Sequence, residues 1–149
     1  MGLGLACLSC FGLTIASAIF PWLSVELIVL ALPVVAHSRS ALALLVVIAV
    51  AGQMTGKCLV YWLSRRGARA ASPGMAARLE RWRVPLTRRP SSPVAIVFLS
   101  SSVGFPPFFA ITAIAGALKL NFGGFLAAGT AGRLIRFAAL VLGTKALGF

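Results

Sequence analysis

Residues 91–118, SSPVAIVFLSSSVGFPPFFAITAIAGAL, decide the fold of this chain because they are uncharged and contain two adjacent prolines. The stretch is long enough to cross a membrane. Pro106 and Pro107 each remove a backbone donor and clash with the preceding turn, so one continuous helix is not expected. Broken backbone at membrane depth survives only where protein or a water-filled cavity covers it. We therefore expect a transporter-like re-entrant segment with a hinge at Gly104, Pro106 and Pro107.

The composition of the chain is that of an integral membrane protein. Of its 149 residues, 60% are hydrophobic and only 11% are charged, whereas soluble domains carry roughly 25% charged residues. We expect a single all-α membrane domain over residues 1–149. It should contain about three spanning helices and two re-entrant, proline-broken hairpins.

Four apolar segments accompany the broken one. Three are long enough to be expected as spans: residues 3–20, 41–63 and 122–147. Residues 22–36 are too few for a spanning helix, which needs roughly 20 residues. Because Pro21 and Pro33 lie at the ends of this short segment, it is predicted to be a re-entrant hairpin or a broken helix hinged at these prolines.

A basic loop, residues 65–93, joins the two halves of the chain. It contains most of the positive charge behind the net charge of +12, with Glu80 as its one acid. A short basic loop between apolar spans marks the cytoplasmic side of a membrane. Binding of nucleic acid is not expected, since no aromatic platform accompanies the arginines.

The basic loop also carries the signals of a short amphipathic helix. Ser72 can cap a helix, Pro73 suits its first position, and Pro85 should stop it. Met75 and Leu79 fall on one face, as in helices that lie at a membrane surface. The alternative is a solvated loop without regular structure.

The two halves carry a similar pattern, which predicts an inverted repeat. In each half, about residues 18–67 and 94–140, a proline-containing segment precedes a glycine-rich span in which a glycine is followed directly by a cation. The basic loop between the halves places the second span in the opposite direction across the bilayer. Substrate sites of such inverted repeats lie near the membrane midplane. The glycines expected at close helix contacts are Gly52, Gly56, Gly116, Gly129 and Gly132.

Four charged residues fall inside apolar segments: Glu26, Lys57, Arg133 and Arg136. A cation at the centre of a spanning helix costs at least about 2.5–3.5 kcal/mol, so such residues normally face a cavity or a partner. Arg133 and Arg136 lie one turn apart and could form one fork-like site. Lys57 could instead extend to the interface. With three cations and one acid, the site predicts an anionic ligand, and a lipid phosphate suits arginine.

Glu26 is expected either to couple transport to protons or to act as a plain counter-ion. No enzymatic activity is expected, because the only other acid is Glu80 and the only histidine is His37, which leaves no acid/base pair or metal cluster. Cys7 and Cys10 form a C-x-x-C motif within an apolar run and are interpreted as small packing residues. Neither a metal nor a cofactor is predicted.

The chain resembles the DedA, or SNARE-associated (VTT-domain), membrane proteins, in particular their short bacterial branch. The resemblance covers roughly residues 18–140. It rests on three motifs: Pro21-Trp22-Leu23-Ser24-Val25-Glu26; Gly52, Gly56, Tyr61, Arg65 and Gly67; and Gly104-Phe105-Pro106-Pro107 followed by Ala115-Gly116, Phe125, Gly129 and Gly132. Longer members carry arginines around the second re-entrant segment. Here that role is either lost or taken over by Arg133 and Arg136.

This resemblance implies transport of lipids across the bacterial inner membrane. The expected substrates are phospholipids or polyprenyl phosphates, moved between leaflets as by a scramblase, either with or without coupling to protons. Homo-oligomers are also expected, because so short a chain can hardly shield two broken segments. The alternative function is a non-transporting membrane factor for envelope assembly that acts through helix–helix partners.

Overall fold

The computed structural model describes residues 2–20, 22–70, 72–88 and 92–146, and all regular structure in these ranges is helical. The elements in chain order are α1 (Leu3–Ile19), α2 (Val25–Val35), α3 (Arg39–Gly67), the 3-10 helix η1 (Ala68–Ala70), α4 (Pro73–Thr87), α5 (Ser92–Val103), α6 (Phe108–Ala117) and α7 (Phe122–Ala146).

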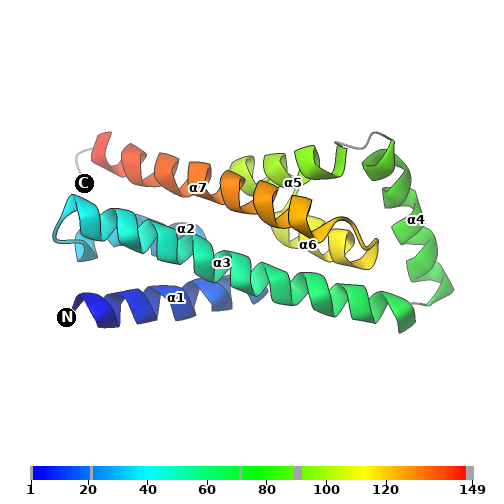
Figure 1. Ribbon diagram of the computed structural model, residues 1–149, viewed down its shortest axis with the longest axis horizontal. Helices are drawn as coiled ribbons and strands as arrows, with labels where there is room; N and C mark the ends of the chain where they lie inside the picture. Colours follow the sequence, from blue (N-terminus) through cyan, green and yellow to red (C-terminus); the bar gives the residue numbers. More distant parts are fainter. Residues whose placement is uncertain (1, 21, 71, 89–91, 147–149) are drawn as a thin grey trace.

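Two long helices, α3 and α7, form the frame of the molecule (Figure 1). Helix α3 has 29 residues and α7 has 25, which gives α3 a length of about 44 Å. Within the described ranges, these are the two helices long and apolar enough to cross a membrane. They correspond to the predicted spans 41–63 and 122–147, and α3 extends further at both ends.

The first two helices form a hairpin, which corrects the prediction for residues 3–36. Helix α1 has 17 residues and ends about halfway along α3, and α2 then returns toward the end where the chain begins (Figure 1). Residues 3–20 are thus one arm of the hairpin. The predicted hinge at Pro33 is wrong, because this residue lies inside the last turn of α2. The predicted hinge at Pro21 lies outside the described residues.

Helices α5 and α6 form a second hairpin, which enters from the opposite end of the molecule (Figure 1). The predicted break at Pro106 and Pro107 is confirmed, since α5 ends at Val103 and α6 begins at Phe108. Gly104 adopts a φ of 90°, a conformation that side chains with a Cβ rarely allow. The peptide bond between Phe105 and Pro106 is cis.

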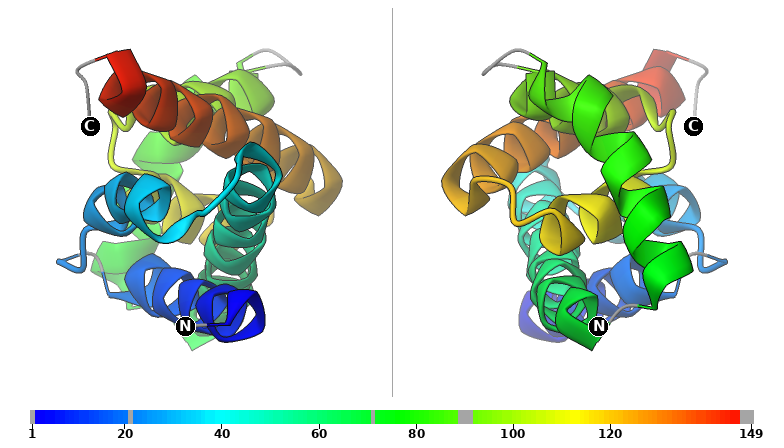
Figure 2. Two further views of the ribbon diagram at one scale, coloured as in Figure 1. Left: turned by 90° about the vertical axis from the view of Figure 1, so that its left-hand side faces the viewer. Right: turned by 90° about the vertical axis from the view of Figure 1, so that its right-hand side faces the viewer.

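Helix α4 crosses the end of the bundle where α3 finishes, roughly at right angles to the long helices (Figures 1 and 2). Its predicted start is confirmed, because the Ser72 hydroxyl accepts a hydrogen bond from the backbone N–H of Met75 at 3.4 Å and Pro73 is the first helical residue. Pro85 does not stop the helix, which continues to Thr87.

The helices pack in the same pairwise pattern in both halves. The first hairpin helix of each half lies on its own long helix, as α1 on α3 and α5 on α7. The second hairpin helix crosses to the long helix of the other half, as α2 on α7 and α6 on α3. Each long helix is therefore covered by one arm of each hairpin.

Glycines allow these helices to approach closely. A Cβ at Gly56 would lie 2.9 Å from the carbonyl oxygen of Ile15 on α1, and one at Gly132 would lie 2.9 Å from that of Phe98 on α5. Real Cβ atoms essentially never come so close. The other predicted packing glycines also lie at helix contacts: Gly52 against α1, Gly116 against Tyr61 of α3, and Gly129 against Met54 and Phe108.

An aromatic cluster joins the two halves at the α4 end of the bundle. Tyr61 on α3 is fully buried and its ring stacks on that of Phe125 on α7, with the ring centroids 5.1 Å apart. Its hydroxyl donates to the carbonyl oxygen of Leu120, in the turn between α6 and α7, and accepts from Arg65. Tyr61 thus fixes the end of α3 to the second half.

Candidate functional site

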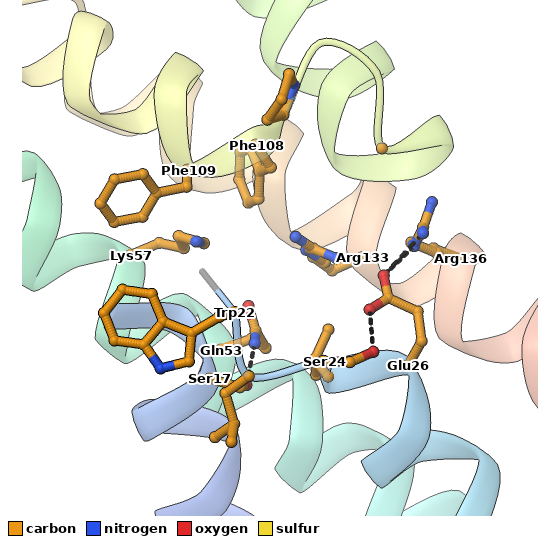
Figure 3. A pocket seen from close by; sticks show the side chains of 14 residues that line it. Ser17, Trp22, Ser24, Glu26, Gln53, Lys57, Phe108, Phe109, Arg133 and Arg136 are labelled. Atoms are coloured by element: carbon orange, nitrogen blue, oxygen red, sulfur yellow. Dashed lines mark hydrogen bonds and ion pairs between the residues drawn. The ribbon is translucent and has the colours of Figure 1, made fainter. Parts of the chain in front are cut away.

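The tips of the two hairpins meet in the middle of the molecule and enclose a cavity of about 280 Å³ (Figure 3). The first tip contributes residues 22–26, and the second contributes Gly104 and residues 107–109. The long helices supply the remaining walls, through Gln53 and Lys57 of α3 and through two arginines of α7. The four charged residues singled out from the sequence all line this one cavity: Glu26, Lys57, Arg133 and Arg136.

Glu26 and Arg136 form an ion pair at one side of the cavity. The guanidinium Nη2 and Nε of Arg136 donate to the Oε1 atom of Glu26 at 2.8 and 3.2 Å. The second carboxylate oxygen accepts a hydrogen bond from the Ser24 hydroxyl at 3.2 Å. Glu26 is therefore bound to α7, and its carboxylate neutralises one of the three cations.

Arg136 also holds the end of α5. Its Nη1 donates to the carbonyl oxygens of Ser102, at 3.4 Å, and of Val103. The last carbonyl groups of a helix have no partner inside it and attract a cation. A Cβ at Gly104 would lie 2.7 Å from this Nη1. Gly104 thus permits both the backbone turn and the approach of Arg136.

Lys57 plays the matching part in the first half. Its side chain is 3% exposed, and its Nζ donates to the carbonyl oxygen of Ala18, in the last turn of α1, at 2.9 Å. The ammonium group also lies over the rings of Phe108 and Phe109, 5.6 and 5.2 Å from their centroids. Lys57 does not extend to the surface, so the alternative of an interfacial lysine is wrong for this structure.

Arg133 is a buried arginine for which the described residues supply no hydrogen-bonding partner at Nε. The residue is 6% exposed. Its guanidinium group lies 4.9 Å from the ring centroid of Phe108 and 5.8 Å from that of Phe137. A cation over an aromatic face gains some stabilisation, but a buried arginine normally forms several hydrogen bonds. Figure 3 shows Arg133 and Lys57 converging below Phe108.

The charges of the cavity do not balance. Of the charged side chains that line it, three are positive and one is negative, and that acid is already paired with Arg136. Lys57 and Arg133 have no acidic partner among the described residues. The expected fork of Arg133 with Arg136 is not formed, because Arg136 turns toward Glu26 and α5. The free positive charge lies at Arg133 and Lys57.

Two helix N-termini face the same cavity. Helix α2 begins at Val25 and α6 at Phe108, and both residues line it. In neither helix does the N-cap side chain satisfy a backbone N–H group. The first N–H groups of a helix lack intrahelical partners and carry a partial positive charge, which favours anions.

Several cavity residues were not foreseen as site residues. Gln53 is 1% exposed; its amide nitrogen donates to the Ser17 hydroxyl at 2.6 Å, and its Oε1 has no partner among the described residues. Gln53 was not predicted from the sequence, where it stands between Gly52 and Gly56. Its polarity within an apolar span was the signal that could have identified it.

The structure also places the other features considered from the sequence. The G-x-x-x-G face at Gly52 and Gly56 is covered by α1 of the same chain. Cys7, Cys10 and Cys58 are free thiols. Over the described ranges, no three His, Cys, Asp or Glu side chains are grouped so that they could hold a metal ion.

Comparisons of the chain with protein-family models, with curated proteins and with solved structures find no match.

Proposed function

We propose that this protein spans a membrane and moves anionic lipids between the two leaflets. The proposal starts from α3 and α7, which have the length and apolar character of spanning helices. With these helices along the membrane normal, α4 would lie in the plane of the interface and carry its arginines there. The excess of basic residues in the segment 65–93, which contains α4, favours the cytoplasmic side for this end of the molecule. The resemblance to the DedA proteins favours the bacterial inner membrane.

In this orientation the two halves form an inverted repeat. Helices α1–α3 and α5–α7 share an order, a pairwise packing pattern and a cation that holds the C-terminal carbonyl groups of the first hairpin helix. The hairpins enter from opposite ends (Figure 1), so each would be re-entrant from a different side of the membrane. Their tips meet near the midplane, where substrate sites of inverted-repeat transporters lie.

The observation that carries the proposal is the buried guanidinium group of Arg133 beside Lys57, because its Nε has no partner among the described residues. A buried charge without a partner is costly, and in this cavity the cost would be offset by an anionic ligand. A phosphate group suits the planar donors of Arg133. The two helix N-termini would add backbone donors.

A lipid is favoured over a soluble anion by the position of the opening. Trp22, at the rim of the cavity, is 80% exposed, and its neighbour Leu23 is 39% exposed. At the midplane of a membrane, this apolar rim would face acyl chains rather than water. A headgroup could then enter sideways while its acyl chains stay in the bilayer.

The ion pair of Glu26 and Arg136 would control the passage of the headgroup. It joins the tip of the first hairpin to α7 and, through the carbonyl groups of Ser102 and Val103, to the tip of the second. Protonation of Glu26 would release Arg136 toward the substrate. This step would provide coupling to protons.

Lipid exchange in reconstituted vesicles tests the proposal. The vesicles contain labelled phosphatidylglycerol or a labelled polyprenyl phosphate. When the protein is present, label from the inner leaflet should become accessible from outside the vesicle faster. Arg133→Gln should remove most of this acceleration, whereas Arg66→Gln, which changes an exposed arginine of the loop, should not. Exchange no faster than in empty vesicles would contradict the proposed function.

A further inference from the structure

We infer that the protein holds an anionic phospholipid at a second site, in a groove between α4 and α6 that is separate from the central cavity. The groove has a volume of about 510 Å³, within the range of roughly 300–1,000 Å³ typical of ligand pockets. Its walls are apolar and come from the end of α3, from α4 and from α6, and include Gly67, Met75, Leu79, Ala113, Ile114 and Ala117.

A basic hollow adjoins this groove and shares Ala68, Leu79 and Ala117 with it. It is lined by Arg69, Arg83, Lys119 and Glu80. The Nη1 of Arg83 lies 3.4 Å from the carboxylate of Glu80. Neither Arg69 nor Lys119 has an acidic partner among the described residues. The hollow therefore offers two positive charges directly beside an apolar channel.

The backbone at Lys119 adds to this inference. Lys119 follows the end of α6 with a φ of 55°, and the N–H of Leu120 donates to the carbonyl oxygen of Ala115 at 2.9 Å. This left-handed position after a helix is usually occupied by glycine. A residue with a Cβ is strained in this conformation. Lys119 thus adopts a strained backbone conformation, and its side chain lines the same hollow as Arg69.

The arrangement fits one class of ligand. An anionic phospholipid combines an acyl chain, which would lie along the apolar groove, with a phosphate, which Arg69 and Lys119 would bind. Helix α4 would lie at the membrane surface under the proposed topology, at the depth of lipid headgroups. A soluble phosphate would leave the exposed Met75, 52% accessible, and its apolar neighbours uncovered. We therefore assign the groove to a lipid.

Native mass spectrometry of the detergent-solubilised full chain tests the site. Phosphatidylglycerol and phosphatidylcholine with identical acyl chains serve as probes, and retention of phosphatidylglycerol should be clearly stronger. The double variant Arg69→Gln/Lys119→Gly should weaken retention about thirtyfold. Because Lys119→Gly relieves the left-handed backbone, this loss is not explained by a destabilised turn. The matched control Arg66→Gln/Arg78→Gln removes the same number of charges at positions outside the groove and the basic hollow. It should retain the lipid.

Three further variants show whether the lipid is bound in this groove, rather than held by general electrostatic attraction or in the central cavity. Ala113→Phe should fill the groove and expel the lipid, whereas Ala127→Phe, at an exposed position of α7, should not. Arg133→Gln should remove only the phosphatidylglycerol bound in the central cavity, whereas a retained lipid that depends on Arg69 and Lys119 should remain, so the result is distinguishable from a failure of the proposed transport. Equal retention by Arg69→Gln/Lys119→Gly and the wild type, or equal loss in both double variants, would overturn the inference. Competition by soluble glycerol phosphate would overturn it too.

Discussion

The carboxylate of Glu26 and the guanidinium group of Arg136, 110 positions apart in sequence, meet at 2.8 Å. Their contact joins the tip of the first hairpin to α7, and Arg136 extends the connection to the last carbonyl groups of α5. One arginine therefore links both hairpin tips. The same contact leaves Arg133 and Lys57 as the cations available to a ligand.

Glu26→Gln should slow lipid exchange about tenfold, because a hydrogen bond between charged groups contributes about 1.5–3 kcal/mol. Without its counter-ion, Arg136 would hold a phosphate in the cavity and delay its release. Vesicle exchange rates, measured together with lipid retention, check this. The control is Glu80→Gln, which changes the only other acid of the chain, in an exposed pair with Arg83. An equal effect of both variants would refute a special role for Glu26.

Arg133→Lys should retain part of the activity and Arg133→Gln very little. Lysine keeps the charge but loses the planar pair of donors that suits a phosphate. We expect exchange to fall by about tenfold for lysine and further for glutamine, since charge-assisted bonds contribute about 1.5–3 kcal/mol each. Initial rates at several lipid fractions separate weaker binding from slower movement. Identical rates for Arg133→Gln and the wild type would remove this residue from the mechanism.

Gly56→Ala should destabilise the fold by about 1–3 kcal/mol, the usual cost of overpacking. The new methyl group would lie 2.9 Å from the carbonyl oxygen of Ile15 and force α1 away from α3. Gly12→Ala is the control, because nothing lies within 4 Å of its Cβ position; it should be neutral or stabilising by up to about 1 kcal/mol. Thermal unfolding in detergent provides the comparison. Equal midpoints for the two variants would show that the close contact is absent.

The alternative function, a non-transporting factor for envelope assembly, predicts a different outcome. It requires that neutral substitutions at Lys57 and Arg133 preserve cellular activity while Gly56→Leu abolishes it. Transport predicts that both kinds of variant lose activity. A complementation assay in cells that depend on the protein distinguishes these cases.

Gly104→Ala should reduce both stability and exchange. Its φ of 90° is strained for alanine, at about 1–3 kcal/mol, and the methyl group would displace the Nη1 of Arg136. Gly143→Ala, where nothing lies within 4 Å, is the matched control. Unfolding midpoints and exchange rates should both fall for Gly104→Ala alone. Wild-type values for that variant would exclude the proposed contact between hinge and arginine.

Single cysteines test the membrane orientation. In a variant whose three native cysteines are replaced, Ser38→Cys and Ser72→Cys place thiols just before α3 and just before α4. Because α3 separates these positions, an impermeant maleimide should label them from opposite sides of the membrane. Cytoplasmic exposure is expected for position 72, in the basic loop. Labelling of both positions from one side would be incompatible with a spanning α3.

The sequence predicted the features that depend on local chemistry. The adjacent Pro106 and Pro107 remove two consecutive backbone donors from a helix, and Ser72 followed by Pro73 begins one, so both predictions are confirmed. Periodicity could not show that residues 3–20 form one arm of a hairpin. A 17-residue apolar helix has the same sequence pattern as a hairpin arm and as a membrane span. Pro33 lies inside α2 although a proline there removes a helix hydrogen bond, so the local rule for proline gave a wrong prediction at this position.

The pairing of the buried charges depended on tertiary structure. Four charged residues in apolar segments could be expected to share a cavity, since a membrane offers them few other places, and the structure brings them together. The packing of α2 on α7 determines which cation pairs with Glu26. In this packing Arg136 forms the ion pair with Glu26, and the guanidinium group of Arg133 lies over the ring of Phe108.

The crossed packing of α2 on α7 and of α6 on α3 has a consequence for assembly. Each half of the chain can bury its second arm only in part, because much of the surface that receives this arm belongs to the other half. Two fragments made by cutting within α4 should therefore be unstable when produced apart and should complement each other when produced together. The interlocked arms, rather than the peptide between them, would hold such a split protein in one piece.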